Sequence, residues 1–414
     1  MNPPNAIQQC SFCGQPATEA RPLQAGNGAA ICPACIARFQ TVAAPGTEAP
    51  RAARREAVTV PRPLEIKQHL DQYCVGQEQA KKTLAVAVHN HYKRVQQSLA
   101  DPSGEGVQIE KSNILMTGPT GSGKTLLART LARVLDVPFA MVDVTTLSEE
   151  GGETLDAESI LRRLLQNADY STEAARHGIV YIDEIDKIAH QTAGSDATGS
   201  FYGKRLQQTL LKIIEGTVGR ITVQDEERFP KPTTLRLDTS EILFICGGAF
   251  VGLEKIIQRR LGRSTLAHTQ KNAIAARDEL LLRVEPEDLL QFGLIPEFVG
   301  RLPVIATLLP LDENQLVTAL TEPKNALVKQ YVKLLAMEGV ELEFTPDALR
   351  ELAAQAMLKE TGARALRGLV ERLMLDVMYE APESTNPVHV KITKAVAEGR
   401  IKPVLQHHYW GGAS

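Results

Sequence analysis

Short apolar runs alternate with longer helical patterns through the middle of the chain. From Leu64 onward, apolar residues recur at helical spacing, and the segments between them are short and rich in β-branched residues. This alternation predicts an α/β protein, in which helices cover a parallel β-sheet. The predicted strands are residues 113–116, 139–142, 178–182 and 241–246.

A different pattern follows in the last quarter of the chain. Helical spacing covers residues 313–337, 346–359 and 362–379, and one late strand is predicted at 388–392. These segments predict a smaller, mostly helical second domain. Two polar, glycine-containing stretches, residues 190–203 and 258–278, are predicted to be exposed loops of the first domain.

The start of the chain lacks both patterns. Its first residues carry two pairs of cysteines, and the stretch after them is rich in Ala, Pro and charge, which indicates a flexible linker. We therefore expect five parts. They are a cysteine module at 1–42, a linker at 43–62, a large α/β domain at 63–311, a small helical lid domain at 312–403 and a tail at 404–414.

Composition limits the class of protein. The chain has 414 residues, 43% of them hydrophobic, and a formal net charge of -3. It is long enough for two to three globular domains, and its acidic balance offers no general attraction for nucleic acid. No apolar run reaches the roughly 18 residues that a membrane span needs, and the N-terminus does not resemble a secretion signal. We expect a cytoplasmic protein with neither a nucleic-acid nor a membrane partner.

One glycine-rich segment carries the strongest chemical signal. It fits the pattern G-x-x-x-x-G-K-[ST], whose backbone N–H groups surround the phosphates of a nucleoside triphosphate, and it lies between a predicted strand and a predicted helix. An ordinary glycine-rich turn is the alternative. We expect Lys124 to meet the β and γ phosphates of ATP or GTP and Thr125 to bind Mg²⁺. The motif consists of Gly118, Pro119, Thr120, Gly121, Ser122, Gly123, Lys124 and Thr125.

Two acids end the predicted strand at 178–182. A sheet-based NTPase holds its metal and its base at such a strand end, so Asp183 is expected to bind Mg²⁺ and Glu184 to activate the attacking water. The alternative is a pair of solvated acids. Hydrolysis also needs positive charge near the γ-phosphate, for which Arg301 and Arg364 are candidates; spacing alone does not distinguish them from surface arginines.

The two cysteine pairs predict a structural metal site. Each is a C-x-x-C turn that can place two thiolates on one tetrahedral Zn²⁺, and four sulfur ligands leave no open coordination position. Two disulfides are the alternative, which a reducing compartment disfavours. Cys74 and Cys246 lie in apolar surroundings and are interpreted as core residues. The predicted ligands are Cys10, Cys13, Cys32 and Cys35.

Taken together, these motifs resemble the ClpX family of AAA+ unfoldases, which feed proteins to the ClpP peptidase. The resemblance implies a homo-hexamer that binds ATP between subunits, with Val75 and Gly76 bordering the adenine. It also implies that Arg301 reaches the neighbouring nucleotide as an arginine finger and that Arg364 is the sensor arginine of the small domain. Family members bind substrates and adaptors through a dimerising zinc module and pull polypeptides through a central pore. The resemblance rests on the cysteine module, the phosphate loop and residues 73–77, 178–187, 210–217, 244–250, 284–302 and 361–367.

The sequence departs from the family at the pore. Where family members carry a Gly-Tyr-Val-Gly loop that grips the substrate, this chain has Gly152 at the aromatic position, flanked by Glu150 and Glu153. Gly offers no side chain to a passing polypeptide. Phe201 and Tyr202, in the predicted loop at 190–203, could replace the missing ring or could pack locally.

Two further loops also differ. The family's Ile-Gly-Phe tripeptide, which docks on ClpP, is absent between residues 258 and 278, so docking to ClpP is doubtful. A basic pore-entrance loop is replaced by Glu227, Arg228 and Phe229 after two further acids, which changes the charge presented to substrates.

The function predicted from these features is that of an ATP-hydrolysing ring ATPase that unfolds or remodels proteins, coupled weakly or not at all to ClpP. A nucleotide-switched scaffold that threads nothing is the alternative. A nucleic-acid-remodelling ATPase is disfavoured because no basic stripe is evident.

Overall fold

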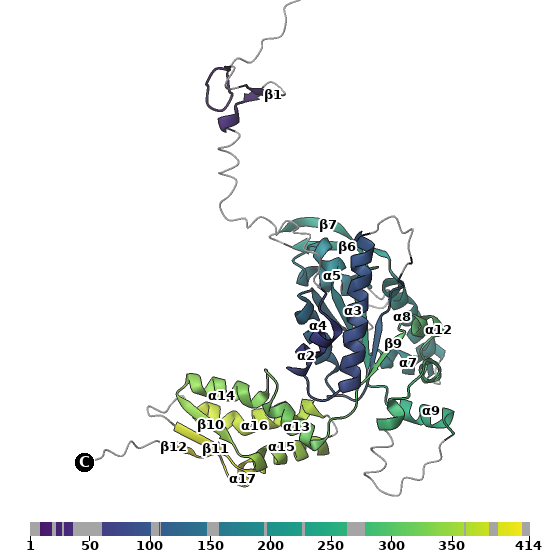
Figure 1. Ribbon diagram of the computed structural model, residues 1–414, viewed down its shortest axis with the longest axis vertical. Helices are drawn as coiled ribbons and strands as arrows, with labels where there is room; N and C mark the ends of the chain where they lie inside the picture. Colours follow the sequence, from purple (N-terminus) through teal and green to yellow (C-terminus); the bar gives the residue numbers. More distant parts are fainter. Residues whose placement is uncertain are drawn as a thin grey trace, which may run out of the picture. The chain divides into compact units, whose positions relative to one another are not determined.

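The structure is a computed structural model, drawn in Figure 1. It describes residues 9–18, 22–26, 29–35, 60–100, 107, 109–146, 157–193, 197–225, 228–262, 278–359, 362–380 and 388–407. The chain divides into two compact units, Met1–Thr59 and Val60–Ser414.

The first unit is small. Strands β1 (Gln24–Gly26) and β2 (Ala29–Ile31) pair antiparallel, with Gln24 opposite Ile31, and a helical turn follows at residues 33–35. Among the residues of this unit that the structure describes, the buried apolar ones are Cys10, Ala30 and Cys32, which is too few for a hydrophobic core to stabilise this part of the chain.

The second unit is built around a five-stranded sheet whose neighbouring strands are all parallel, in the order β4-β5-β8-β3-β9. The four predicted strands are present, so the predicted α/β class with a parallel sheet is confirmed. The fifth strand, β9, was not predicted. The strands are β3 (Ile114–Thr117), β4 (Phe139–Asp143), β5 (Ile179–Asp183), β8 (Leu243–Gly248) and β9 (Val304–Thr307).

Helices surround this sheet because its central strands are apolar on both faces. Every residue of β3 and β8 is buried, as is typical of parallel strands between helical layers. The helices are α2 (Pro63–Asp71), α3 (Glu78–Ala100), α4 (Lys124–Leu135), α5 (Ala157–Asn167), α6 (Thr172–Arg176), α7 (Asp186–Ala193), α8 (Ala197–Glu215), α9 (Leu253–Arg260), α11 (Pro286–Phe292) and α12 (Pro296–Gly300). None of the helices that the structure describes combines the length and hydrophobicity required to cross a membrane.

The loop predicted at 190–203 is wrong for residues 190–193 and 197–203, and residues 194–196 lie outside the described part of the chain. Helix α7 extends to Ala193 and helix α8 begins at Ala197, so these polar residues continue helices that also contain buried residues, such as Ile188 and Leu206. Phe201 and Tyr202 fall within α8, and their side chains lie outside the description.

A two-stranded antiparallel sheet was also not predicted. It consists of β6 (Val218–Asp225) and β7 (Phe229–Asp238), with Val218 opposite Asp238 and an irregularity between Val223 and Asp225. Phe229, the last residue of the segment that corresponds to the family's basic pore-entrance loop, begins β7.

The C-terminal part is mostly helical, as predicted. Asp312 caps helix α13 by accepting a hydrogen bond from the Gln315 N–H, and Thr345 caps helix α15 in the same way from the Ala348 N–H. The helices are α13 (Glu313–Thr321), α14 (Leu327–Met337), α15 (Pro346–Leu358), α16 (Ala363–Glu380) and α17 (Lys394–Ala397). A small sheet, in the order β10-β11-β12, adds β10 (Val340–Phe344) and β12 (Leu405–His407) to the predicted β11 (Val388–Ile392).

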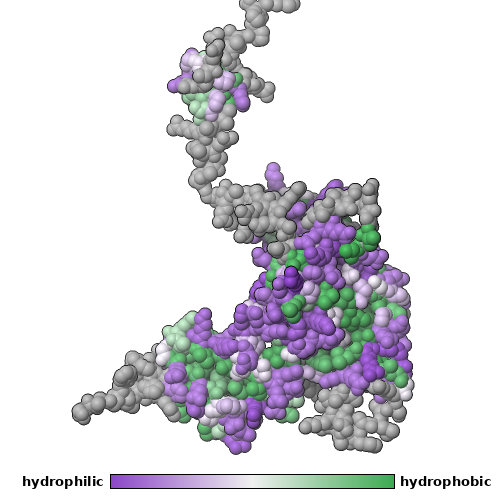
Figure 2. All heavy atoms as spheres, viewed as in Figure 1, coloured by the Kyte–Doolittle hydropathy of each residue, from purple (hydrophilic) through white to green (hydrophobic). Residues whose placement is uncertain are grey.

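Hydrophilic residues are spread over the visible face of the Val60–Ser414 unit, with apolar residues between them (Figure 2). Four predictions concern residues outside the described part of the chain. They are the linker between residues 43 and 59, the pore loop with Gly152, the docking loop from residue 263 to 277, and the acids Glu226 and Glu227.

Candidate functional site

The predicted phosphate loop connects the end of β3 to the start of α4. Gly118 and Gly123 both have positive φ angles, 147° and 102°. A Cβ atom at Gly118 would collide with the Leu308 carbonyl, and one at Gly123 would lie 3.3 Å from Cys74 Sγ. Only glycine fits these two positions, and the turn leaves the N-terminus of α4 free to face an anion.

Lys124 is the first residue of α4 and is only 8% exposed. Its Nζ donates hydrogen bonds to the carbonyl oxygens of Gly118 at 2.6 Å and Pro119 at 2.9 Å. Burial lowers the pKa of Lys124, whereas the charges of Asp183 and Asp186 act in the opposite direction. The ammonium group is therefore held inside the loop, where the phosphates of a nucleotide would contact it.

Asp183 lies at the carboxyl end of β5, beside the phosphate loop. Its Oδ2 accepts a hydrogen bond from Thr125 Oγ1 at 3.2 Å, and its Oδ1 accepts from Tyr181 Oη at 3.1 Å and from the Glu184 N–H at 3.0 Å. A hydroxyl and a carboxylate side by side fit the oxygen preference of Mg²⁺. Thr125 and Asp183 are the residues that would hold this ion.

Glu184 follows directly and is partly buried. Its backbone is in the left-handed region, with φ at 58°, which turns the chain sharply after the strand. Burial, followed by the charge of Asp143, raises the pKa of Glu184. A carboxylate with a raised pKa is a better proton acceptor, as a general base requires.

Arg364, from the C-terminal part of the chain, lines the same pocket, whose volume is about 410 Å³. The neighbouring Gly362 has φ at 53°, and a Cβ atom there would lie 3.3 Å from the Thr120 carbonyl oxygen. The helical part therefore lies directly against the phosphate loop. The pocket residues are Thr120, Gly121, Gly123, Lys124, Thr125, Leu126, Asp183, Glu184, Asp186, Lys187, Gly248, Ala249, Val251, Ala363 and Arg364.

Neither Val75 nor Gly76 is among these pocket residues. Gly76 lines a second pocket of about 380 Å³ together with Gln315 of α13. A Cβ atom at Gly76 would lie 2.9 Å from Gln315 Nε2. The next residue, Gln77, connects the two regions, because its Nε2 donates to Ser122 O at 3.3 Å and to Leu309 O at 2.7 Å.

Arg301 lies elsewhere. It caps the end of α12, is 53% exposed, and donates from Nε to Glu215 Oε1 at 2.9 Å. Arg301 is not one of the described residues that line the pocket of Lys124 and Arg364. The Arg301 side chain thus faces solvent and does not lie in its own chain's nucleotide site.

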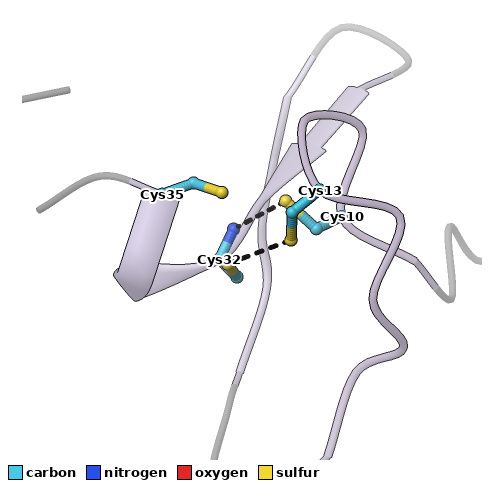
Figure 3. A group of neighbouring side chains, drawn as sticks. All are labelled: Cys10, Cys13, Cys32 and Cys35. Carbon is cyan, nitrogen blue, oxygen red and sulfur yellow. Dashed lines mark hydrogen bonds between the residues drawn. The ribbon is translucent and has the colours of Figure 1, made fainter. Parts of the chain in front are cut away.

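The four predicted zinc ligands converge in the first unit (Figure 3). Cys10 and Cys13 come from one turn, and Cys32 and Cys35 come from the end of β2 and the helical turn after it. Their four sulfur atoms lie within 4.8 Å of one another, and Cys13 Sγ is 3.8 Å from Cys32 Sγ. Zn–S bonds of about 2.3 Å in a tetrahedron place sulfurs about 3.8 Å apart, so the cluster fits Zn²⁺.

The environment of Cys10 also suits a metal ligand. Burial opposes its ionisation, but hydrogen bonds from the backbone at Cys13, Phe12 and Cys32 lower the pKa of Cys10 to about 6. One of these is from the Cys32 N–H, 3.3 Å from Cys10 Sγ. Zinc binds thiolates, so groups that favour the thiolate favour the metal.

Sequence reasoning assigned no role to Gln77, Asp143 or Tyr181. Tyr181 could have been noticed as the single hydroxyl in an otherwise apolar strand, two residues before Asp183. Asp143 could have been found because it ends a predicted strand of the same sheet, and the carboxyl ends of parallel strands share one edge. Gln77 has no comparable signal, because its partner Leu309 is distant in the sequence.

Family models match all three predicted globular parts of the chain. Residues 8–44 match a ClpX C4-type zinc finger, residues 109–305 an AAA domain of the Cdc48 subfamily, and residues 311–394 the C-terminal D2-small domain of ClpB protein. Together with the phosphate loop and the acids at the end of β5, these matches define an AAA+ ATPase with a zinc module.

A protein described as the ATP-dependent Clp protease ATP-binding subunit ClpX, from Porphyromonas gingivalis, is 45% identical over 401 residues, which cover 95% of this chain and 96% of the relative. The chain belongs to the ClpX family. The predicted fold class, the ATPase class and the cofactors ATP, Mg²⁺ and Zn²⁺ are thereby confirmed.

Proposed function

We propose that this chain hydrolyses ATP to unfold or remodel protein substrates. The observation that carries the proposal is the convergence of Lys124, Asp183, Glu184 and Arg364 on one pocket of about 410 Å³. A phosphate-binding cation, two acids and an arginine from the other domain are the groups that phosphoryl transfer requires.

Each of these residues has its own task. Lys124 and the N–H groups of the loop hold the phosphates, and Thr125 and Asp183 hold Mg²⁺, which neutralises phosphate charge when bound. Glu184 orients a water molecule and accepts its proton, a role supported by its raised pKa. Arg364 senses the nucleotide from the small domain, a role supported by its place in the lining of the same pocket.

Arg301 acts on the nucleotide that a neighbouring subunit binds. Its exposed position, away from its own chain's pocket, supports the proposal that a second copy of the chain brings its nucleotide to this arginine. We propose a homo-hexamer with ATP between subunits, and Val75 and Gly76 beside the adenine.

The domain boundaries keep their predicted values in this proposal: a zinc module at 1–42, a linker at 43–62, the large domain at 63–311, the lid at 312–403 and a tail at 404–414. The start of that tail, Leu405–His407, is strand β12 and pairs with β11 of the lid. The division of the chain after Thr59 supports a zinc module that folds separately. We propose that this module dimerises and binds substrates or adaptors.

Coupling to ClpP is the least supported part of the family's activity. The chain has no Ile-Gly-Phe tripeptide between residues 258 and 278, and Gly152 replaces the pore aromatic. We propose remodelling with weak or no coupling to ClpP. Because a pore without that ring grips poorly, a nucleotide-switched scaffold that threads nothing is the second candidate.

One set of assays tests these proposals. ATP turnover and the unfolding of a tagged fluorescent protein are measured for the wild type and for Glu184→Gln, with and without ClpP. A remodelling ATPase consumes ATP and abolishes the fluorescence, and Glu184→Gln does neither. Hydrolysis with intact fluorescence would favour the scaffold, and efficient degradation with ClpP would contradict weak coupling.

A further inference from the structure

Both oxygens of the Asp183 carboxylate are fixed by hydrogen bonds from this chain. Oδ2 accepts from Thr125 Oγ1, whereas Oδ1 accepts from the Glu184 N–H and from the hydroxyl of Tyr181 at 3.1 Å. A carboxylate has about four acceptor positions, so Oδ1 is nearly saturated and Oδ2 retains free lone-pair capacity. The arrangement directs the free acceptor position of Asp183 toward the Thr125 side of the pocket.

The hydroxyl of Tyr181 has a specific place in the sheet. Tyr181 is 0% exposed and lies on β5, which pairs with β8 so that Tyr181 is opposite Ile245. Its hydroxyl end occupies the space beside Gly247 of β8, where any Cβ atom would collide with it. The neighbouring strand thus lacks a side chain at the one point where the tyrosine passes toward Asp183.

We propose that Tyr181 is a positioning residue for the magnesium nucleotide. It does not touch the ion or the nucleotide; it holds Asp183 so that Oδ2 and Thr125 Oγ1 face the pocket together. Hydrogen bonds on the outer side of a metal ligand fix its orientation, and losing one typically costs about 10- to 100-fold in metal affinity or activity. This inference rests on the proposed function, because it assigns Asp183 to Mg²⁺.

The chain contains a matched control. Tyr92 of α3 is also 0% exposed and also uses its hydroxyl as a donor, to the His177 carbonyl oxygen at 2.9 Å. Tyr92→Phe therefore removes one buried hydrogen bond from the same unit, as Tyr181→Phe does. The bond that Tyr92→Phe removes is to the His177 carbonyl, before β5 begins, and not to Asp183. A general loss of stability affects both variants, whereas a loss of metal affinity affects only the tyrosine beside Asp183.

The experiment measures binding in the full-length chain. The dissociation constant of Mn²⁺, a paramagnetic stand-in for Mg²⁺, is measured by electron paramagnetic resonance with saturating ADP. The affinity for a fluorescent ADP analogue is measured separately in EDTA. Tyr181→Phe is expected to weaken Mn²⁺ binding by about 10-fold while leaving metal-free ADP binding unchanged. Tyr92→Phe is expected to match the wild type in both measurements.

Gly247→Ala gives a second, independent test, because a methyl group there displaces the Tyr181 hydroxyl without removing it; it should weaken Mn²⁺ binding in the same direction. Wild-type Mn²⁺ affinity in Tyr181→Phe, or an equal loss in Tyr92→Phe, would overturn the positioning role. A wild type that binds no Mn²⁺ with saturating ADP would instead overturn the assignment of Asp183 to the metal and with it the proposed function.

Discussion

Arg301 donates from Nε to Glu215 Oε1 across 2.9 Å, and both side chains are exposed, by 53% and 40%. An exposed ion pair contributes at most about 1 kcal/mol. Arg301 can therefore leave Glu215 at a small cost in free energy when a more strongly charged anion comes within reach. A phosphate of the nucleotide bound to a neighbouring subunit would be such an anion. The ion pair therefore orients Arg301 at the surface only weakly.

Mixed oligomers test whether Arg301 acts between subunits. Arg301→Ala and Glu184→Gln should each abolish most ATP hydrolysis, because each removes a group that the reaction needs. Mixing the two variants should restore part of the rate, since some sites then combine an intact Glu184 with an intact Arg301 from the next subunit. Turnover of the mixture is compared with that of the separate variants.

The matched control is Glu215→Ala, which removes the ion pair and leaves Arg301 in place. It should retain nearly the wild-type rate. If Glu215→Ala were as inactive as Arg301→Ala, the arginine would have a structural role in its own chain.

The pH dependence of hydrolysis should depend on Asp143. Burial and the charge of Asp143 raise the pKa of Glu184 above its ordinary 4.5. Glu184 works as a base only when ionised, so activity is present above this raised pKa and is lost as the pH falls through it. Asp143→Asn removes a negative charge, lowers the pKa of Glu184 and should move the acid limb of kcat/KM to lower pH.

Asp376→Asn provides the control for this shift. Asp376 lies on α16, is exposed and pairs with Lys402 at 3.2 Å, away from the pocket-lining residues. Its replacement should leave the acid limb in place. An unshifted limb in Asp143→Asn would mean that another group controls activity at low pH.

The parts of the site that sequence reasoning found are those whose chemistry is local. Lys124 and Thr125 belong to one loop, and Asp183 and Glu184 follow one apolar strand, so spacing alone identified them. The proposed roles of Val75, Gly76, Arg301 and Arg364 came from the family resemblance and stay predictions, although Arg364 does line the pocket. Tyr181 was counted as one more apolar residue of β5, although its hydroxyl contacts Asp183.

The missed strands and the wrong loop also depend on contacts between segments, which local sequence patterns do not show. Pro230 and Pro232 argue against a strand, yet both lie in β7. Among the described strands β7 pairs with β6 alone, so it is an edge strand, where a residue without an N–H is tolerated. Residues 190–203 are polar enough for a loop, but residues 190–193 belong to α7 and residues 197–203 to α8, helices that also contain the buried Ile188 and Leu206. In β10, the alternation of Val340, Glu341, Leu342 and Glu343 was the signal that could have predicted it.

Contact between the lid and the phosphate loop should depend on Gly362. Alanine in the left-handed region costs about 1–2 kcal/mol, and at Gly362 its Cβ would also press on the Thr120 carbonyl at 3.3 Å. Gly362→Ala should therefore lower stability and raise the KM for ATP several-fold, because the loop and Arg364 shift together.

Gly339→Ala separates these two effects. Gly339 has φ at 73° with no other atom within 4 Å of its Cβ position, so its replacement causes the same kind of backbone strain without a collision. The midpoint temperature of thermal unfolding should fall in both variants, and the KM for ATP should rise only in Gly362→Ala. An equal rise in KM would show that lost stability alone, and not contact with the loop, accounts for the change.

Removing zinc should unfold the first unit and leave the second intact. Of the residues described around Cys10, Cys13, Cys32 and Cys35, only Ala30 is another buried apolar residue, so we expect the metal to supply most of the folding free energy, about 10 kcal/mol or more in comparable modules. Cys10→Ser should abolish zinc binding, measured as metal per chain, while the thermal midpoint of the Val60–Ser414 unit stays the same. Cys74→Ser makes the same chemical change outside the cluster and should keep the wild-type zinc content. A first unit that retains its structure in EDTA and loses it in a reducing agent would instead support two disulfides, the alternative that the spacing alone left open.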